Sequence, residues 1–114
     1  MAGPARFSRA DVVIVLFPYS DLSESKTRPA LILAELPLGE EFILCQITSQ
    51  FHADADSVLL TADDFARGTL NKISNVRPNR IFTAHQSLFQ GRVGALKQDR
   101  FSAVVDTLVD ILQR

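Results

Sequence analysis

The sequence lacks the residues that several common kinds of protein depend on. It has no tryptophan and one cysteine, Cys45, so no disulfide can form within the chain. Cys45 lies in an apolar run, which favours a buried, unreactive thiol and weakly indicates a reducing, cytoplasmic setting. No apolar run approaches the roughly 20 residues that span a bilayer, and the first ten residues lack the apolar centre of a secretory signal.

The usual signatures of metal and nucleophile chemistry are also missing. His52 and His85 have no spacing typical of a zinc site, and Cys45 has no neighbouring base. No glycine-rich phosphate loop is present. Asp54 and Asp56 alternate and could share a metal, but any solvated pair looks the same. We therefore expect neither a metal nor a cofactor.

What the sequence does have is enough apolar material for a core. Apolar residues make up 46% of the 114 residues, and eight phenylalanines supply bulk. This length and composition predict one domain over residues 1–114, with residues 1–8 frayed.

The charge is divided along the chain although the formal net charge is only −1. Residues 35–66 carry seven acids and no base, whereas residues 67–100 carry seven bases and one acid. Two interpretations stay open. The basic segment lines one face and holds a polyanion, or the two segments pair as neighbours and neutralise each other.

Short β-branched and apolar runs predict a chain made mainly of strands. Pro78 falls within one of these runs, which indicates an edge strand or a bulged one. Residues 63–68 indicate a turn or a single helical turn. The predicted strands are 11–17, 29–34, 42–48, 57–61, 75–83 and 91–96.

The tail has a different period. Apolar residues recur there at three- and four-residue steps, from Phe101 to Leu112, with Asp106 and Asp110 on the opposite side. Asp99 stands just ahead as a candidate N-cap. The pattern predicts one amphipathic helix that closes a small, strongly bent sheet or barrel.

Two polar residues stand at predicted strand ends. Arg28 begins the second strand and Thr48 ends the third. If these strands are antiparallel neighbours, the two side chains face each other at one rim of the sheet. The guanidinium fork suits a phosphate, and threonine adds a hydroxyl. The alternative is a salt bridge from Arg28 to Asp21 or Glu24, with Thr48 a plain strand residue.

An ordered set of segments resembles the PemK/MazF family of toxin endoribonucleases. The segments are DVVIVLFPYSDLSESKTRPALIL, CQITSQ, DFARGTLNKISNVRPNRIFT and GRVGAL, followed by the tail helix. The resemblance implies an SH3-like or CcdB-like barrel, mainly β with a C-terminal helix, that forms a homodimer. It also implies metal-independent cleavage of single-stranded RNA within a type II toxin–antitoxin system, and a cognate antitoxin as partner. Carried over by position, Arg28 matches the family's catalytic arginine and Thr48 its catalytic threonine.

Substrate contacts are expected around this pair. The candidate stacking surfaces for bases are Phe17, Tyr19 and Phe51, although each side chain could instead pack in the core or rim. Base edges could be read by Gln50 and Asn79, beside Ser49. Phosphates could be tracked by Lys26, Arg77 and Arg80, the two arginines having strand pairing with the acidic segment as their alternative.

Two further functions stay open. A toxin of the same fold could inhibit a protein such as DNA gyrase, although the chain ends without the aromatic residue that this class presents. A barrel without catalysis could only bind RNA or protein.

Overall fold

The computed structural model describes residues 6–18, 25–50 and 54–114. In this part of the chain there are seven strands, two 3-10 helices and one α-helix. They are β1 (Asp11–Pro18), β2 (Ser25–Glu35), β3 (Glu41–Thr48), β4 (Val58–Leu60), η1 (Ala62–Asp64), β5 (Phe65–Gly68), β6 (Ser74–His85), η2 (Gln86–Leu88), β7 (Phe89–Leu96) and α1 (Gln98–Leu112).

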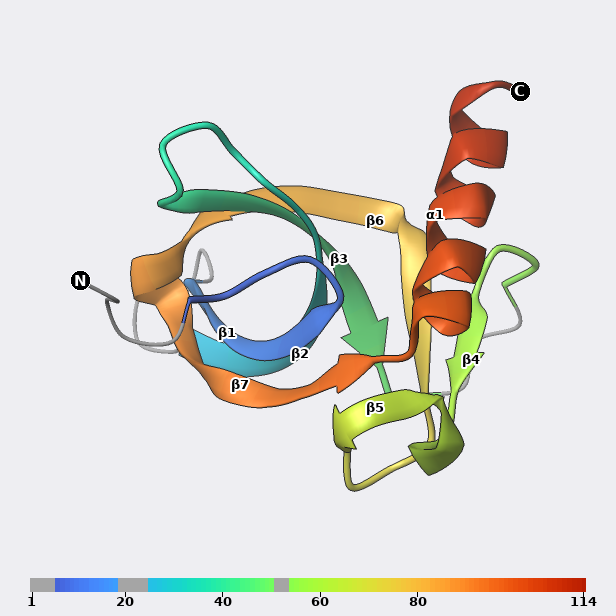
Figure 1. Cartoon of the computed structure of the whole chain (residues 1–114), viewed down its shortest axis with the longest axis horizontal. Helices are drawn as coiled ribbons and strands as arrows, with labels where there is room; N and C mark the ends of the chain where they lie inside the picture. Colours follow the sequence, from blue (N-terminus) through green and yellow to red (C-terminus); the bar gives the residue numbers. More distant parts are fainter. Residues whose placement is uncertain (1–5, 19–24, 51–53) are drawn as a thin grey trace.

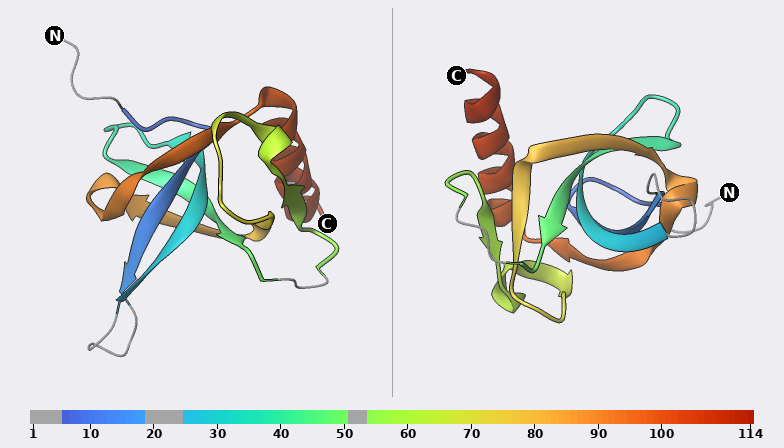
Figure 2. Two further views of the ribbon diagram at one scale, coloured as in Figure 1. Left: turned by 90° about the horizontal axis from the view of Figure 1, so that it is seen from below. Right: turned by 180° about the vertical axis from the view of Figure 1, so that it is seen from behind.

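The strands form one antiparallel sheet that curls into a half-barrel. Its order is β4-β6-β3-β2-β1-β7-β5. Figure 1 shows β1, β2, β3, β6 and β7 curving around a common centre, with α1 standing beside β6 and β4. Figure 2 shows the same arrangement from below and from behind. The predicted fold, a mainly β, strongly bent antiparallel sheet with a C-terminal helix, is confirmed.

The sheet is buried on both faces because its central strands alternate between two cores. On one face, Leu31 and Cys45 pack with Phe101 and Val104 of α1. On the other face, which lines the inside of the curl, Ile32 and the strand β3 contribute to a second cluster, which we call the inner core. Its buried members are Val13, Val15, Ala30, Ile32, Phe42, Leu44 and Ala84. Successive side chains of a strand point to opposite faces, so β2 supplies both cores at once.

Burial decides the chemistry of the single cysteine. Cys45 is fully buried and unpaired. Loss of hydration raises the pKa of its thiol to about 12, because the thiolate is disfavoured away from water. The expected buried, unreactive thiol is confirmed.

The structure decides between the two alternatives for the strand with Pro78 and corrects one further prediction. β6 lies between β4 and β3, so it is not an edge strand. The bulge alternative is the one found, because the register passes from Cys45↔Ile81 to Gln46↔Arg77 and leaves Pro78 outside the ladder. The turn or single helical turn predicted over residues 63–68 is found only at its start, in the 3-10 helix η1, and Phe65–Gly68 form the strand β5 instead. Gly68 (φ 63°) ends this strand so close to β7 that a Cβ would lie 2.1 Å from the carbonyl oxygen of Val93.

Two predictions about chain ends are also corrected. The N-cap of α1 is Lys97, and Asp99 lies in the first helical turn, where an acid favours the helix dipole. The described part of the predicted frayed segment is packed. Phe7 makes edge-on contacts with the rings of Phe42 and Phe89, at centroid distances of 6.5 and 5.0 Å.

The acidic and basic segments partly neutralise each other. Asp54 pairs with Arg77 at 3.1 Å, and Asp64 pairs with Arg100 at 3.1 Å. Arg92 pairs with Asp11 of β1, outside the acidic segment. The remaining basic residues of the segment form no ion pair with any described residue, and they are Arg67, Lys72, Arg80 and Lys97. The neutralising interpretation therefore holds for Arg77 and Arg100. That the rest of the segment holds a polyanion stays a prediction.

Candidate functional site

The register of β2 and β3 leads Arg28 and Thr48 to the same end of the sheet. The first pair of the antiparallel ladder is Ala30 with Gln46, and Arg28 and Thr48 each lie two residues beyond it on their strands. Both side chains have the parity of Ala30, so they lie on the same face of the sheet. The β1–β2 ladder extends past this point and pairs Arg28 with Val15, so the arginine stands on a strand held by β1.

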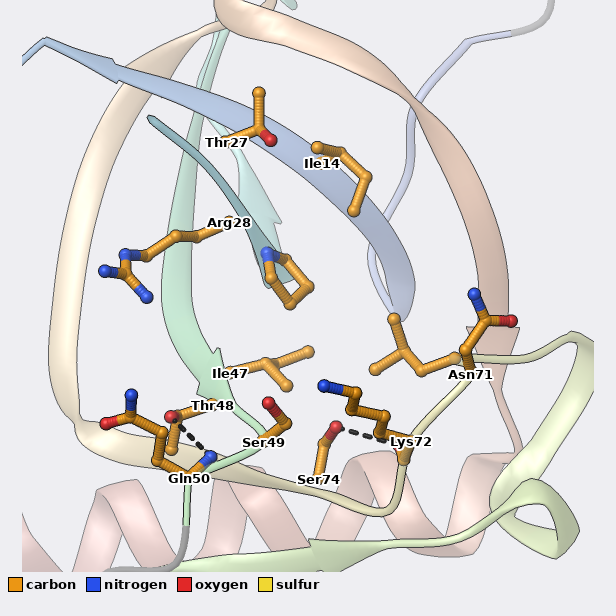
Figure 3. A pocket seen from close by; sticks show the side chains of 12 residues that line it. Ile14, Thr27, Arg28, Ile47, Thr48, Ser49, Gln50, Asn71, Lys72 and Ser74 are labelled. Carbon is orange, nitrogen blue, oxygen red and sulfur yellow. Dashed lines mark hydrogen bonds between the residues drawn. The ribbon is translucent and has the colours of Figure 1, made fainter. Parts of the chain in front are cut away.

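Arg28 and Thr48 line one pocket of about 380 Å³ at the end of these strands (Figure 3). β2 and β3 supply two walls, and the chain between β5 and β6 supplies another. The lining residues are Ile14, Thr27, Arg28, Pro29, Ile47, Thr48, Ser49, Gln50, Leu70, Asn71, Lys72 and Ser74. The neighbouring face of β3 also belongs to the core, since Ile47 is 2% exposed. The pocket is therefore built directly on the rigid sheet.

The lining is positively charged. It contains two cations, Arg28 and Lys72, and its described residues include no acid. An arginine stays protonated at any physiological pH, so its charge is permanent. Four apolar residues, Ile14, Pro29, Ile47 and Leu70, form what we call the apolar patch of the pocket. A cationic site with an apolar patch suits an anion that carries a ring or sugar.

Thr48 is held by a local hydrogen bond. The backbone N–H of Gln50 donates to Thr48 Oγ1 at 3.1 Å. This contact uses a lone pair of the hydroxyl oxygen, so the hydroxyl hydrogen can donate to a phosphate oxygen. The same turn carries Ser49 and Gln50 into the pocket lining.

The chain just after this turn is fixed by Asp54. Its carboxylate accepts from the N–H of Asp56 at 2.9 Å and from Asn79 and Arg77 at 3.1 Å each. The hydrogen bonds from Asp56, Asn79 and Arg77 hold the pKa of Asp54 below its ordinary value. Arg77 therefore pairs with the acidic segment, the alternative named above, and the amide of Asn79 is directed to Asp54.

The remaining predicted contacts that the structure describes do not belong to the pocket lining. Phe17 is half-buried and packs on Phe82, with ring centroids 5.1 Å apart, within the inner core. Lys26 and Arg80 are exposed on β2 and β6. The predictions for Tyr19, Asp21, Glu24 and Phe51 fall on positions outside the described residues.

The structure adds residues that the sequence did not single out. Leu70, Asn71 and Lys72 precede β6, and Ser74 is its first residue. All four line the pocket with β2 and β3. Only the excess of bases in residues 67–100 pointed toward Lys72. The place of this segment depends on β5, which was not predicted.

The candidate metal ligands are engaged elsewhere. Asp54 pairs with Arg77, and Asp56 pairs with Arg114 at 2.6 Å. Among residues 6–18, 25–50 and 54–114, no three side chains of histidine, cysteine or acid gather as a metal ion would need. In the same ranges, no helix has the length and apolar character needed to cross a membrane.

Comparisons with known proteins agree on one family. The family described as "PemK-like, MazF-like toxin of type II toxin-antitoxin system" matches residues 8–112. No curated protein gives a significant match.

Solved structures share the fold at low sequence identity. The Mycobacterium tuberculosis toxin MazF-mt6 is 20% identical over 90% of this chain and 96% of its own, with a TM-score of 0.70. A MazE-MazF structure from Deinococcus radiodurans is 16% identical, covers 96% and 98%, and has a TM-score of 0.76. A mycobacterial endoribonuclease in complex with its cognate antitoxin is 14% identical, covers 94% and 93%, and has a TM-score of 0.69.

Proposed function

Because the chain belongs to the PemK-like, MazF-like toxin family of type II toxin–antitoxin systems, we propose that it cleaves single-stranded RNA at short sequences without a metal ion. The observation that carries the proposal is the pair formed by Arg28 and Thr48. They come from adjacent antiparallel strands, share one face and line one pocket. Some solved structures with this fold are named endoribonucleases, which supports the same activity here.

The proposed reaction is attack of a ribose 2′-hydroxyl on the adjacent phosphorus. The new O–P bond closes a 2′,3′-cyclic phosphate, and the bond to the 5′-oxygen breaks to leave a 5′-hydroxyl end. The proton lost by the 2′-hydroxyl and the one gained by the 5′-oxygen balance overall. The step builds negative charge on the non-bridging phosphate oxygens.

Arg28 would stabilise that charge with its planar fork of donors, and Thr48 would donate its hydroxyl hydrogen to a phosphate oxygen. Arginine is a poor acid and threonine a poor base near pH 7. The contribution of the pair therefore comes from electrostatics and from holding the strand in line for attack. Pro29 restricts Arg28 to extended backbone conformations, which helps to aim the guanidinium.

Other residues would bind the RNA on either side. Ser49 and Gln50 line the pocket, and in this proposal they would contact a base or ribose. Lys26 lies two residues before Arg28 on β2, so it shares the same face and could extend the phosphate track. Phe17, Tyr19, Asn79 and Arg80 stay proposals, with Asn79 required to exchange its bond to Asp54 for one to RNA.

The partners proposed are a cognate antitoxin and a second copy of the chain. Solved relatives include complexes with MazE and with a cognate antitoxin. Such a system would act in the cytoplasm, where its RNA substrate is made. We propose no cofactor.

The test is incubation of the purified protein with a mixed pool of single-stranded RNA in excess chelator. The proposal expects new 5′-hydroxyl ends opposite 2′,3′-cyclic phosphates, clustered at one short sequence. A 2′-O-methyl version of the same pool should stay intact, because its attacking hydroxyl is blocked. Binding of RNA without cleavage would select a binding barrel, and gyrase inhibition without cleavage would select a protein-poisoning toxin.

A further inference from the structure

We infer that Lys72 holds a second phosphate of the RNA strand, next to the scissile one held by Arg28, so that the pocket takes two successive phosphates with one nucleoside between them. The inference rests on the proposed function and assigns a role to a residue that the sequence did not single out.

The pocket carries its cations on two separate walls. Arg28 comes from β2 and Lys72 from the segment before β6, so the two cations belong to different walls. Figure 3 shows the amine of Lys72 directed into the pocket. The described lining includes no acid, and Lys72 forms no ion pair with any described residue. Its amine, on a different wall from Arg28, gives the pocket a second position for an anionic group.

The surface between the two cations is apolar. The apolar patch (Ile14, Pro29, Ile47 and Leu70) belongs to the same pocket. The pocket volume of about 380 Å³ suits a small organic group rather than an ion alone. A nucleoside between two phosphates has this character, with a flat apolar face and polar edges. Ser49 and Asn71 supply polar groups for those edges.

The fold holds the backbone of Lys72 in place. Ser74 is 3% exposed, and its hydroxyl donates to the carbonyl oxygen of Lys72 at 3.0 Å. Leu70, two residues before Lys72, packs against the core beneath α1. The backbone of Lys72 is thus anchored on both sides while its side chain is exposed. Preorganisation of this kind reduces the entropy lost when a phosphate binds.

The main experiment compares Lys72→Gln with Lys97→Gln. Both remove one exposed lysine charge, but Lys97 is the N-cap of α1 and lies outside the pocket lining. Binding of a 2′-O-methyl single-stranded oligonucleotide pool is measured over a range of salt concentrations. Lys72→Gln should flatten the slope of log K against log salt by about 0.7, the value for one lost contact to a single strand. Lys97→Gln should keep the wild-type slope.

The cleavage kinetics give a second readout. A contact to a neighbouring phosphate is made equally in the ground and transition states, so its loss raises KM and leaves kcat nearly unchanged. We expect Lys72→Gln to raise KM roughly tenfold at low salt. A fall in kcat without a change in KM would overturn the inference, because Lys72 would then act at the reacting phosphate.

Ser74 is proposed as a positioning residue for Lys72. Ser74→Ala should raise KM in the wild-type background and have no further effect in the Lys72→Gln background, because its role passes through the lysine. Equal effects in both backgrounds would overturn this part.

The outcomes separate the inference from the proposed function. If the wild type cuts RNA and Lys72→Gln keeps its salt slope and KM, the second phosphate site is wrong and the ribonuclease proposal stands. If the wild type neither binds the pool nor cuts RNA, the proposed function fails first and Lys72 loses its role with it.

Discussion

Replacing Arg28 with alanine is expected to remove RNA cleavage while leaving the fold intact. Arg28 is an exposed residue of β2, and its guanidinium belongs to neither core. Truncation of an exposed side chain, with the loss of a surface interaction included, changes the free energy of unfolding by about 1 kcal/mol or less. Loss of one donor aimed at the developing oxyanion lowers the rate about 100- to 1000-fold, equivalent to ~3–4 kcal/mol of transition-state stabilisation.

The assay is single-turnover cleavage of one RNA in excess chelator, with circular dichroism and urea unfolding on the same preparations. Arg28→Lys keeps the charge but loses the planar fork, so its rate should fall between those of the wild type and Arg28→Ala. Arg67→Ala is the matched control, because Arg67 is exposed on β5 and lies outside the pocket lining. Undiminished cleavage by a folded Arg28→Ala variant would refute the assignment.

Three further predictions concern the fold. Although burial acts to raise it, the pKa of Asp64 is held below its ordinary value by its hydrogen bonds and by Arg100, so Asp64→Asn should cost about 1 kcal/mol of stability at pH 7. Because the pKa of Asp64 is lower in the folded state, its carboxylate stabilises the folded protein at pH values above the unfolded pKa of about 4. In thermal unfolding, the stability difference between the wild type and Asp64→Asn should therefore shrink as the pH falls below that value. A stability difference that grew on acidification would contradict this prediction. The thiol of Cys45, with its pKa near 12, should fail to react with a disulfide reagent at pH 8 until urea unfolds the protein, and rapid labelling of the folded protein would rule out its burial. Leu44→Ala removes a fully buried side chain and should cost about 2–5 kcal/mol in urea unfolding, whereas Leu38→Ala, at a side chain 89% exposed, should change stability by about 0.5 kcal/mol or less; equal effects would count against the inner core.

The approach of Arg28 and Thr48 could be predicted from the sequence because it needs only one assumption. Two apolar runs joined by a short turn form an antiparallel pair, and in such a pair the start of one strand meets the end of the other. The ladder from Ala30↔Gln46 to Glu35↔Phe42 bears this out. Residue types then add a cation and a hydroxyl at the shared end.

The wall formed by Asn71 and Lys72 could not be predicted, because it depends on long-range pairing. β5 is four residues long and ends in Gly68, which has the local pattern of a turn. It is a strand only because β7 lies close enough for its backbone to pair. Without β5, nothing in the sequence places the segment before β6 beside β2.

The roles of Arg77 and Asn79 show a second limit. Both are polar residues near the bulge of β6, and their types suit RNA as well as they suit a carboxylate. Asp54, which precedes Arg77 by 23 residues, accepts from both. Which partner a polar side chain takes depends on three-dimensional distance, and a sequence does not give that distance.

The most direct test of the central claim is a double-mutant cycle on Arg28→Ala and Thr48→Val, read as single-turnover cleavage of one RNA. If the guanidinium and the hydroxyl act together on one phosphate, the double variant should be slower than the slower single variant by less than about tenfold. Rate losses that multiply in full, to roughly 10⁴-fold or more from singles of about 100-fold each, would mean that the two residues act independently. That result would contradict a shared phosphodiester site.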